Sequence, residues 1–311
     1  METDVFAPEI RFGLAALSVS HLERSIAFYR ETLGFRLVQR DNDNALLGVD
    51  TAMLLLIQEK DAGPRPINAL GLYHIAILVP GRADLAGSLR HLREVAYPLR
   101  DASDHIVSEA LYLDDPDGNG IEIYRDRPRS TWPWQNGRLY GSNSSEPLDL
   151  ENLLSELDEN DYTWRGLPSR TCIGHIHLQV ADLGHAATFY RKAFGLDETI
   201  TGIAGACFLA AHGYHHHLGL NTWNSLGASR PRENVVGLRF FVICLRDAAA
   251  VERIAAQLEA AGIPWERWKH RGHGADLNAL VLHDADGNTI LVMADLPQSN
   301  EEVISLAKMQ R

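Results

Sequence analysis

Four segments of the sequence begin in the same way, and this internal repeat limits the possible folds more than any other feature. Each segment starts with an alternating or continuously apolar run, breaks at a polar stretch, and continues with apolar residues at helical spacing, as at Leu85, Leu89 and Leu92. Shorter strand-like runs follow each helical segment. The repeat therefore predicts an α+β fold built from four βαβββ modules. These modules cover residues 9–60, 70–125, 172–223 and 236–295.

The stretch between the second and third modules differs in composition from the rest. It is rich in Trp, Pro, Ser and Asn, and it contains one short amphipathic segment, "LDLENLLSEL". We therefore predict a division of the chain into four parts. They are an N-terminal pair of modules over residues 9–125, a linker with a short helix over 126–170, a C-terminal pair over 171–295, and a tail over 296–311.

Composition narrows the kinds of partner. The 311 residues are 45% apolar, and the formal charge is −12 at pH 7. An acidic chain lacks the basic face that nucleic acids and anionic membranes require, so we expect small-molecule partners. The N-terminus has no basic and apolar leader, and no segment has the roughly 20 apolar residues of a membrane span, so we expect a cytoplasmic protein. The three cysteines, Cys172, Cys207 and Cys244, are expected to be small core residues.

The repeat resembles the vicinal oxygen chelate superfamily, in which paired βαβββ modules curl into half-barrels around a metal ion. The resemblance implies metal ligands on the first strand of each paired module and near the start of the last strand of one of them. Aligning the four modules with one another identifies the corresponding positions here. They are Leu14, His74, His175 and Phe240 in the first strands, and Glu122 and Leu291 in the last strands of modules 2 and 4.

These positions favour one pairing of the modules. Modules 2 and 3 supply His74, Glu122 and His175, whereas modules 1 and 4 supply only apolar residues; pairing 1 with 2 and 3 with 4 would leave His175 alone. Two histidines and a carboxylate form the facial triad that leaves open coordination positions in non-haem Fe(II) oxygenases. We therefore expect an Fe(II) site, with Mn(II) as the other candidate ion, between modules 2 and 3. These modules pair either within one chain or across a dimer.

The stretch "HIVSEALYLDDPDGNGIEIY" is similar to the signature of the extradiol ring-cleaving dioxygenases. The resemblance implies that Glu122 binds the metal, and that His105 and Tyr112 stand beside the substrate. One departure is Ser103, two residues before His105, which is not a usual residue there. Module 4 serves as an internal control, because its matching positions are Gly274, Val281 and Leu291, none of which can do the same chemistry.

A second stretch, "GYHHHLGLNTW", places three consecutive histidines in module 3. We expect them on a strand that lines the same half-barrel, where the resemblance implies an acid/base residue near bound dioxygen. Alternation along a strand lets either His216, or His215 and His217 together, face the metal, and the resemblance favours His216. Trp223 is expected either to form the floor of an aromatic site or to be a packing residue.

Each of these residues also has an ordinary structural explanation. A single strand histidine is more often a hydrogen-bonded core residue than a ligand, and we interpret His177 in that way. The candidates nevertheless all lie in modules 2 and 3, while the matching positions of modules 1 and 4 are apolar or small. Independent accidents would not produce such a distribution.

The resemblance implies a non-haem Fe(II) extradiol dioxygenase that opens a catechol-type ring with dioxygen to give a muconic semialdehyde. Tyr112 would hold the deprotonated substrate oxygen, His216 would stabilise and protonate the bound oxygen species, and His105 would hydrogen-bond the substrate hydroxyl. The alternatives are a metal-dependent glyoxalase or thiol transferase of the same superfamily, and a metal-free small-molecule binding protein. The family also suggests a homo-oligomer.

Overall fold

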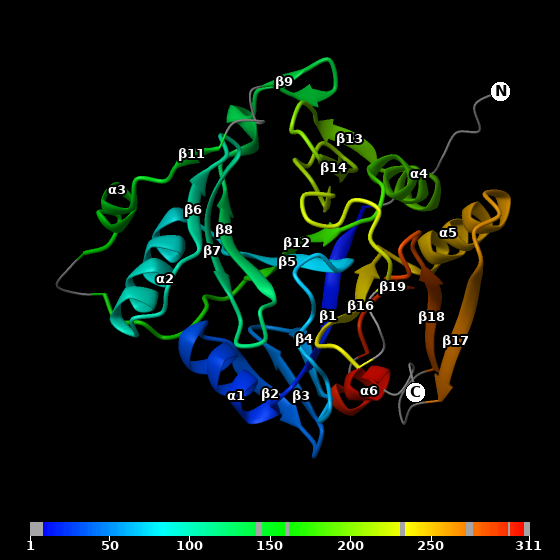
Figure 1. Cartoon of the computed structure of the whole chain (residues 1–311), viewed down its shortest axis with the longest axis horizontal. Coiled ribbons are helices and arrows are strands. Elements are labelled where there is room, and N and C mark those ends of the chain that lie inside the picture. Colours follow the sequence, from blue (N-terminus) through cyan, green and yellow to red (C-terminus); the bar gives the residue numbers. More distant parts are fainter. Residues whose placement is uncertain are drawn as a thin grey trace.

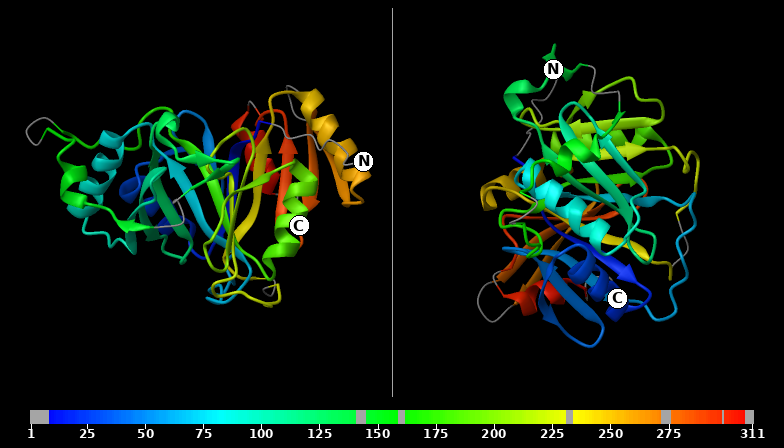
Figure 2. Two further views of the ribbon diagram at one scale, coloured as in Figure 1. Left: turned by 90° about the horizontal axis from the view of Figure 1, so that it is seen from above. Right: turned by 90° about the vertical axis from the view of Figure 1, so that its left-hand side faces the viewer.

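Each of the four predicted modules is present as a strand, a helix and three further strands. The structure is a computed structural model, and it describes residues 9–140, 145–158, 162–230, 234–271, 276–297 and 299–307. Figure 1 shows module 2 at the left, module 3 at the top, module 1 at the bottom and module 4 at the right. Helices α2 and α5 lie at opposite ends of the molecule (Figure 2).

The first two modules have the same order of elements. Module 1 contains β1 (Arg11–Val19), α1 (Leu22–Ala27) with a π-helical turn η1 (Phe28–Thr32), β2 (Arg36–Arg40), β3 (Asn44–Gly48) and β4 (Ala52–Gln58). Module 2 contains β5 (Gly71–Leu78), α2 (Arg82–Glu94), β6 (Asp101–Asp104), β7 (Ser108–Asp114) and β8 (Gly120–Asp126). The predicted helical spacing in α2 is confirmed, because Leu85, Leu89 and Leu92 are its buried leucines.

The second two modules repeat this order. Module 3 contains β12 (Cys172–Gln179), α4 (Leu183–Phe194), β13 (Asp197–Ile200), β14 (Ala206–Ala210) and β15 (Leu218–Asn221). Module 4 contains β16 (Gly237–Cys244), α5 (Ala248–Ala260), β17 (Trp265–Arg271), β18 (Asp276–His283) and β19 (Thr289–Met293). The linker contains η2 (Arg129–Thr131), β9 (Trp134–Gln135), β10 (Arg138–Leu139), β11 (Glu146–Pro147) and α3 (Leu150–Leu154), and the tail contains α6 (Asn300–Ser305).

The first strands of the modules pair in the predicted way, within one chain. β5 runs antiparallel to β12, with Ala76 opposite His175. β1 runs antiparallel to β16, with Val242 opposite Leu14. Both pairs have a register shift just before the ligand position, so the two interfaces repeat the same irregularity. Modules 2 and 3 therefore form one half-barrel, and modules 1 and 4 form the other.

The last strands extend this repetition to the third ligand position. β8 lies parallel to β5 with Glu122 beside Ala76, and β19 lies parallel to β16 with Leu291 beside Val242. The alignment of the modules is thus correct residue by residue at these positions. In the described part of the chain, the module strands and β11 form one 17-stranded sheet, and β9 and β10 form a separate two-stranded sheet.

The half-barrel of modules 1 and 4 is filled by apolar side chains. Leu14, Phe240 and Leu291, at the three ligand positions, belong to one buried cluster with residues of β3, β4 and β18. Helix α6 adds Val303 and Ile304 to this cluster, and Figure 1 shows it between modules 1 and 4. The C-terminal helix therefore closes the apolar half-barrel.

A buried tyrosine connects the helix of one module to a turn of another in each half of the chain. The hydroxyl of Tyr29 donates to Oδ2 of Asp115 at 3.0 Å, and the hydroxyl of Tyr190 donates to Oδ2 of Asp284 at 2.7 Å. The two carboxylates also accept backbone N–H groups of their own turns. The repeated "FY" of modules 1 and 3 thus supplies equivalent hydrogen bonds.

Replacing Tyr29 or Tyr190 with Phe should lower the free energy of unfolding by about 1–3 kcal/mol, because a buried carboxylate would lose a hydrogen-bond donor. Chemical denaturation with a matched Tyr140→Phe control would measure the effect, since Tyr140 is 68% exposed. Equal stability of all three variants would show that these two hydrogen bonds contribute nothing.

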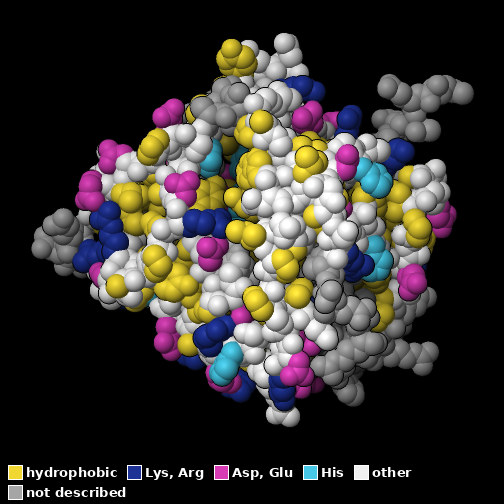
Figure 3. Space-filling view, viewed as in Figure 1, with side chains coloured by type: hydrophobic (Ala, Val, Ile, Leu, Met, Phe, Trp, Pro, Cys, Tyr) yellow, Lys and Arg dark blue, Asp and Glu magenta, His cyan; other side chains and the backbone are white. Residues whose placement is uncertain are grey.

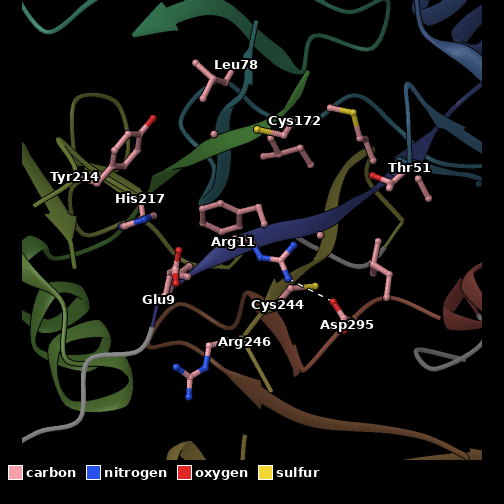
Figure 4. A pocket seen from close by; sticks show the side chains of 18 of the residues that line it. Glu9, Arg11, Thr51, Leu78, Cys172, Tyr214, His217, Cys244, Arg246 and Asp295 are labelled. Atoms are coloured by element: carbon pink, nitrogen blue, oxygen red, sulfur yellow. Dashed lines mark hydrogen bonds and ion pairs between the residues drawn. The ribbon is translucent and has the colours of Figure 1, made fainter. Parts of the chain in front are cut away.

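The cysteine prediction is partly wrong. Cys207 and Cys244 are buried, but Cys172 is exposed. It is the first residue of β12, where the chain enters the sheet beside a cavity between the two half-barrels, so its side chain has no core to face. Figure 4 shows Cys172 on the wall of that cavity.

Among the described residues, every helix is too short or too polar to cross a membrane. The division into domains at residues 125 and 171 stays a prediction, and the pairing of β5 with β12 crosses it, because modules 2 and 3 lie on opposite sides of the linker.

Candidate metal centre and substrate cavity

Three neighbouring strands bring His74, Glu122 and His175 together. Oε2 of Glu122 lies 2.9 Å from Nε2 of His74 and 2.9 Å from Nε2 of His175, and the two Nε2 atoms are 3.3 Å apart. All three side chains are buried. Gly120 makes this approach possible, because a Cβ atom there would lie 2.1 Å from the carbonyl oxygen of Tyr73. β8 can therefore lie close enough to β5 to place Glu122 beside His74.

The charges of the centre suit metal binding. Burial alone would raise the pKa of Glu122, but His175 and His74 together hold it well below its usual value, so the carboxylate stays ionised. Burial is the main reason why the pKa of His175 is lowered to about 4, so its ring is neutral at pH 7. A neutral imidazole and an ionised carboxylate are the forms that ligate metals.

The donor set fits a divalent ion that leaves room for other ligands. Candidate ligand atoms of the three residues lie within 4.8 Å of one another, and one nitrogen of each ring points at the shared centre. Two imidazoles and one carboxylate are typical of Fe(II) sites with open positions, and are fewer than the four ligands of a closed zinc site. Among the residues that the structure describes, the outward Nδ1 atoms of both rings are buried without a hydrogen-bond partner, so none of these residues gives the outer support usual for ligating histidines.

His105 and Tyr112 lie beside this centre. Nε2 of His105 is 2.9 Å from the Tyr112 hydroxyl, and the Tyr112 ring is 5.7 Å from the His74 ring. Burial, followed by the charge of Glu122 and a hydrogen bond with it, raises the pKa of Tyr112 well above its usual value, so the hydroxyl keeps its hydrogen. Burial lowers the pKa of His105, which favours a neutral ring.

The histidine run does not lie on a strand, which corrects the prediction. β15 begins only at Leu218, and His215, His216 and His217 belong to the preceding turn. The reason is local, since His212 and Gly213 both have positive φ, at 54° and 66°, and turn the chain before the strand can start.

The three side chains of the run point in different directions. His216 lines the cavity at the metal centre, and its ring lies 4.1 Å from that of His175. His215 is fully buried and contacts Asp126. His217 lies beside Tyr214 on the wall of the cavity between the two half-barrels, which is called the second cavity below (Figure 4). Its Nδ1 atom accepts a hydrogen bond from the Ala211 N–H. The structure therefore brings only His216 to the metal centre.

The metal centre opens into a cavity of about 310 Å³. Its polar lining includes the three candidate ligands and, away from them in the sequence, Arg100, Asp101, Ser103, Ser108 and Ser145. The apolar and aromatic lining includes Tyr73, Val107, Ile200, Ile203, Phe208 and Trp223. Its volume lies at the small end of the range of ligand pockets, which suits a single aromatic ring. Figure 3 shows histidine side chains within a hollow on this face, between modules 2 and 3.

Several residues that the sequence left open can now be placed. Trp223 lies on the cavity wall, and its indole N–H donates to the carbonyl of Ala204. His177 is buried and its Nε2 atom is 3.1 Å from Nδ2 of Asn221, but it also lines the cavity, with its ring 4.8 Å from that of His74, so it is more than the core histidine predicted. Ser103 lines the cavity. The predicted counterpart of His105 in module 4, Gly274, lies outside the described residues.

Sequence analysis missed Asp126. It is the last residue of β8, on the face that also carries Glu122 and Tyr124, and it is 2.9 Å from the ring of His215. The alternation of Glu122, Tyr124 and Asp126 along one strand was the available signal.

The chain belongs to the Glyoxalase/Bleomycin resistance protein/Dioxygenase superfamily, because residues 11–123 and 172–292 match the model of that family. A catechol-2,3-dioxygenase of Bacillus subtilis (strain 168) is 39% identical over 259 residues, which make up 82% of this chain and 89% of that protein. A biphenyl-2,3-diol 1,2-dioxygenase 2 of Rhodococcus globerulus is 30% identical over 118 residues, or 36% of this chain and 57% of that protein. The predicted resemblance to ring-cleaving dioxygenases is confirmed.

Solved structures agree on the fold. A protein from Bacillus subtilis subsp. subtilis str. 168 has a TM-score of 0.63 at 15% identity, covering 94% of this chain and 87% of its own. Glyoxalase I from Zea mays has a TM-score of 0.55 at 17% identity, covering 96% and 95%. At these identities the likeness concerns the fold alone.

Proposed function

We propose that the protein is a non-haem Fe(II) extradiol dioxygenase, which cleaves a catechol-type ring with dioxygen to give a muconic semialdehyde. The observation that supports this most directly is the meeting of His74, Glu122 and His175 at one end of a small aromatic-lined cavity. The similarity over 82% of the chain to a catechol-2,3-dioxygenase supports the same reaction class.

His74, Glu122 and His175 would hold the iron. When bound, iron would let electron density pass between a chelated diol and dioxygen. Mn(II) remains the other candidate ion, because triads of this kind accept either.

The other polar residues would act on the substrate. The hydroxyl of Tyr112 keeps its hydrogen, so it can donate to a substrate oxygen that has lost its own proton. The neutral ring of His105 lies next to that hydroxyl and can hydrogen-bond a substrate oxygen. Burial holds the pKa of His216 well below its usual value, so it is a neutral imidazole that can take up a proton. Phe208 and Ile200 would limit the access of water to the ring.

A metal-dependent transferase is the second candidate. A metallothiol transferase FosB of Lysinibacillus sphaericus (strain C3-41) is 32% identical over 109 residues, or 34% of this chain and 76% of that protein. Such an enzyme has no evident need for His105, Tyr112 and His216 around one cavity. A metal-free binding protein would have no need of the triad.

Anaerobic loading with Fe(II), followed by catechol and air, separates these candidates. The proposal expects a yellow product that forms together with matched uptake of dioxygen. Binding of iron without dioxygen uptake on a panel of simple catechols would contradict it and favour the transferase. Failure to bind any divalent ion would favour the metal-free protein. A cytoplasmic location and assembly into a homo-oligomer are part of the same proposal.

A further inference from the structure

Asp126 and the histidine run form a chain of hydrogen bonds that ends at the cavity. Nε2 of His215 lies 2.9 Å from Oδ1 of Asp126, and Nδ1 of His215 lies 2.7 Å from Nδ1 of His216. Among the described residues, Nε2 of His216 has no hydrogen bond, and His216 lines the cavity beside His175. One nitrogen of His216 is therefore tied to His215, while the other is available to a substrate.

The surroundings of His215 hold its ring in one orientation. The side chain is fully buried, and the rings of Tyr214 and Trp132 lie 4.2 Å and 5.2 Å from it. The Thr199 hydroxyl donates to its backbone carbonyl. Tyr214 is held as well, because its hydroxyl lies 2.8 Å from that of Tyr124. These contacts thus fix the ring of His215 in the series of hydrogen bonds from Asp126 to His216.

The hydrogen-bond roles along this chain determine where each hydrogen lies. An ionised carboxylate can only accept, so the hydrogen between Asp126 and His215 belongs to Nε2 of His215. With a single ring hydrogen on His215, its Nδ1 atom is an acceptor. The hydrogen between the two rings then belongs to Nδ1 of His216. Nε2 of His216 is left with a lone pair, on a side chain that lines the cavity.

We propose that Asp126, acting through His215, is a positioning residue that fixes His216 in the Nδ1–H tautomer. This inference rests on the proposed function, since it states how His216 meets a catechol. The substrate O–H bond would break with its proton passing to Nε2 of His216, and the electron pair would stay on the substrate oxygen. Asp126 itself lines the separate cavity of about 960 Å³ shown in Figure 4, not the substrate cavity, so it touches no reacting atom.

Nitrogen NMR of the metal-free protein tests the tautomer without any reliance on activity. With ¹⁵N-labelled histidine, and with the His216 signals assigned by their loss in His216→Phe, Nδ1 of His216 should be of the protonated type and Nε2 of the unprotonated type. In Asp126→Asn, the side-chain amide can either accept from or donate to His215, so a population of the other tautomer should appear. A protonated Nε2 of His216 in the unaltered protein would overturn the inference, as would a doubly protonated His215.

Kinetics of the iron-loaded protein tests the consequence. Asp126→Asn should lower kcat by about 10–100-fold, as loss of an outer support typically does, while KM for catechol changes less than about threefold. Asp50→Asn is the matched control, because Asp50 lines the same second cavity and accepts the Arg170 N–H, and among the described residues no histidine forms a hydrogen bond or ion pair with it. A shifted tautomer with unchanged kcat would overturn the positioning role. The expected tautomer in an unaltered protein that takes up no dioxygen would instead contradict the proposed function.

Discussion

Replacing Glu122 with Ala should abolish dioxygen uptake and greatly weaken metal binding. Loss of a residue that only hydrogen-bonds a metal ligand typically lowers metal affinity by roughly 10–100-fold, and the loss of Glu122 itself should lower it far more. Glu122 is the one anionic residue of the triad, and its carboxylate lies 2.9 Å from both imidazoles, so the variant would leave the two rings with no carboxylate to hold a cation. Titration of the metal-free protein with Fe(II) under anaerobic conditions measures the affinity. His175→Ala should have the same consequence.

The apolar half-barrel supplies the control. Leu291 occupies the position equivalent to Glu122, so Leu291→Ala makes a similar change of size in a strand with the same register. This variant should lose stability, by roughly 2–5 kcal/mol as for other large-to-small core changes, but it should bind metal as tightly as the unaltered chain. Full metal affinity in Glu122→Ala would refute the assignment of the triad.

Replacing His216 with Phe should lower kcat by about 10²–10⁴-fold, the usual contribution of a positioned proton-transfer group. The substrate is expected to bind mainly through the metal and Tyr112, so KM for catechol should change much less than kcat. The ring of His216 packs 4.1 Å from that of His175, and Phe preserves most of that packing. Steady-state kinetics over a range of catechol and dioxygen concentrations separates the two parameters.

His217→Phe is the appropriate comparison, because it is the neighbouring histidine and faces the other cavity. It should retain kcat within a few-fold. Equal loss in both variants would mean that the run acts through the shape of the turn rather than through a proton on His216. Unchanged turnover in His216→Phe would remove its assigned role.

The sequence was sufficient to predict the architecture because the repeat is visible in the residues themselves. A strand, a helix and three strands recur four times, and pairing by ligand position requires only that Leu14, Phe240 and Leu291 be apolar where His74, His175 and Glu122 are not. The register of β1 with β16 and of β5 with β12 then follows from the common origin of the modules. Whether the pairing lies within one chain is a matter of how the linker runs, which composition does not specify.

The parts that sequence could not supply depend on single backbone angles and on contacts between distant segments. The positive φ at His212 and Gly213 delays β15, so alternation along a strand was the wrong rule for the histidine run. Asp126 becomes significant only once β8 and the turn before β15 lie side by side, 89 residues apart in the chain. Cys172 is exposed because a cavity separates the half-barrels at that point.

The apolar half-barrel also has a consequence for the stability of the protein after its metal is lost. Modules 1 and 4 keep the register of modules 2 and 3 without any metal ligand, because packing of apolar side chains and helix α6 hold the strands in place. The backbone that aligns the triad is therefore a product of folding, not of iron. We expect loss of the metal proposed for the triad to leave an intact protein that regains activity when the metal returns, so that inactivation calls for reloading of the site rather than synthesis of a new chain.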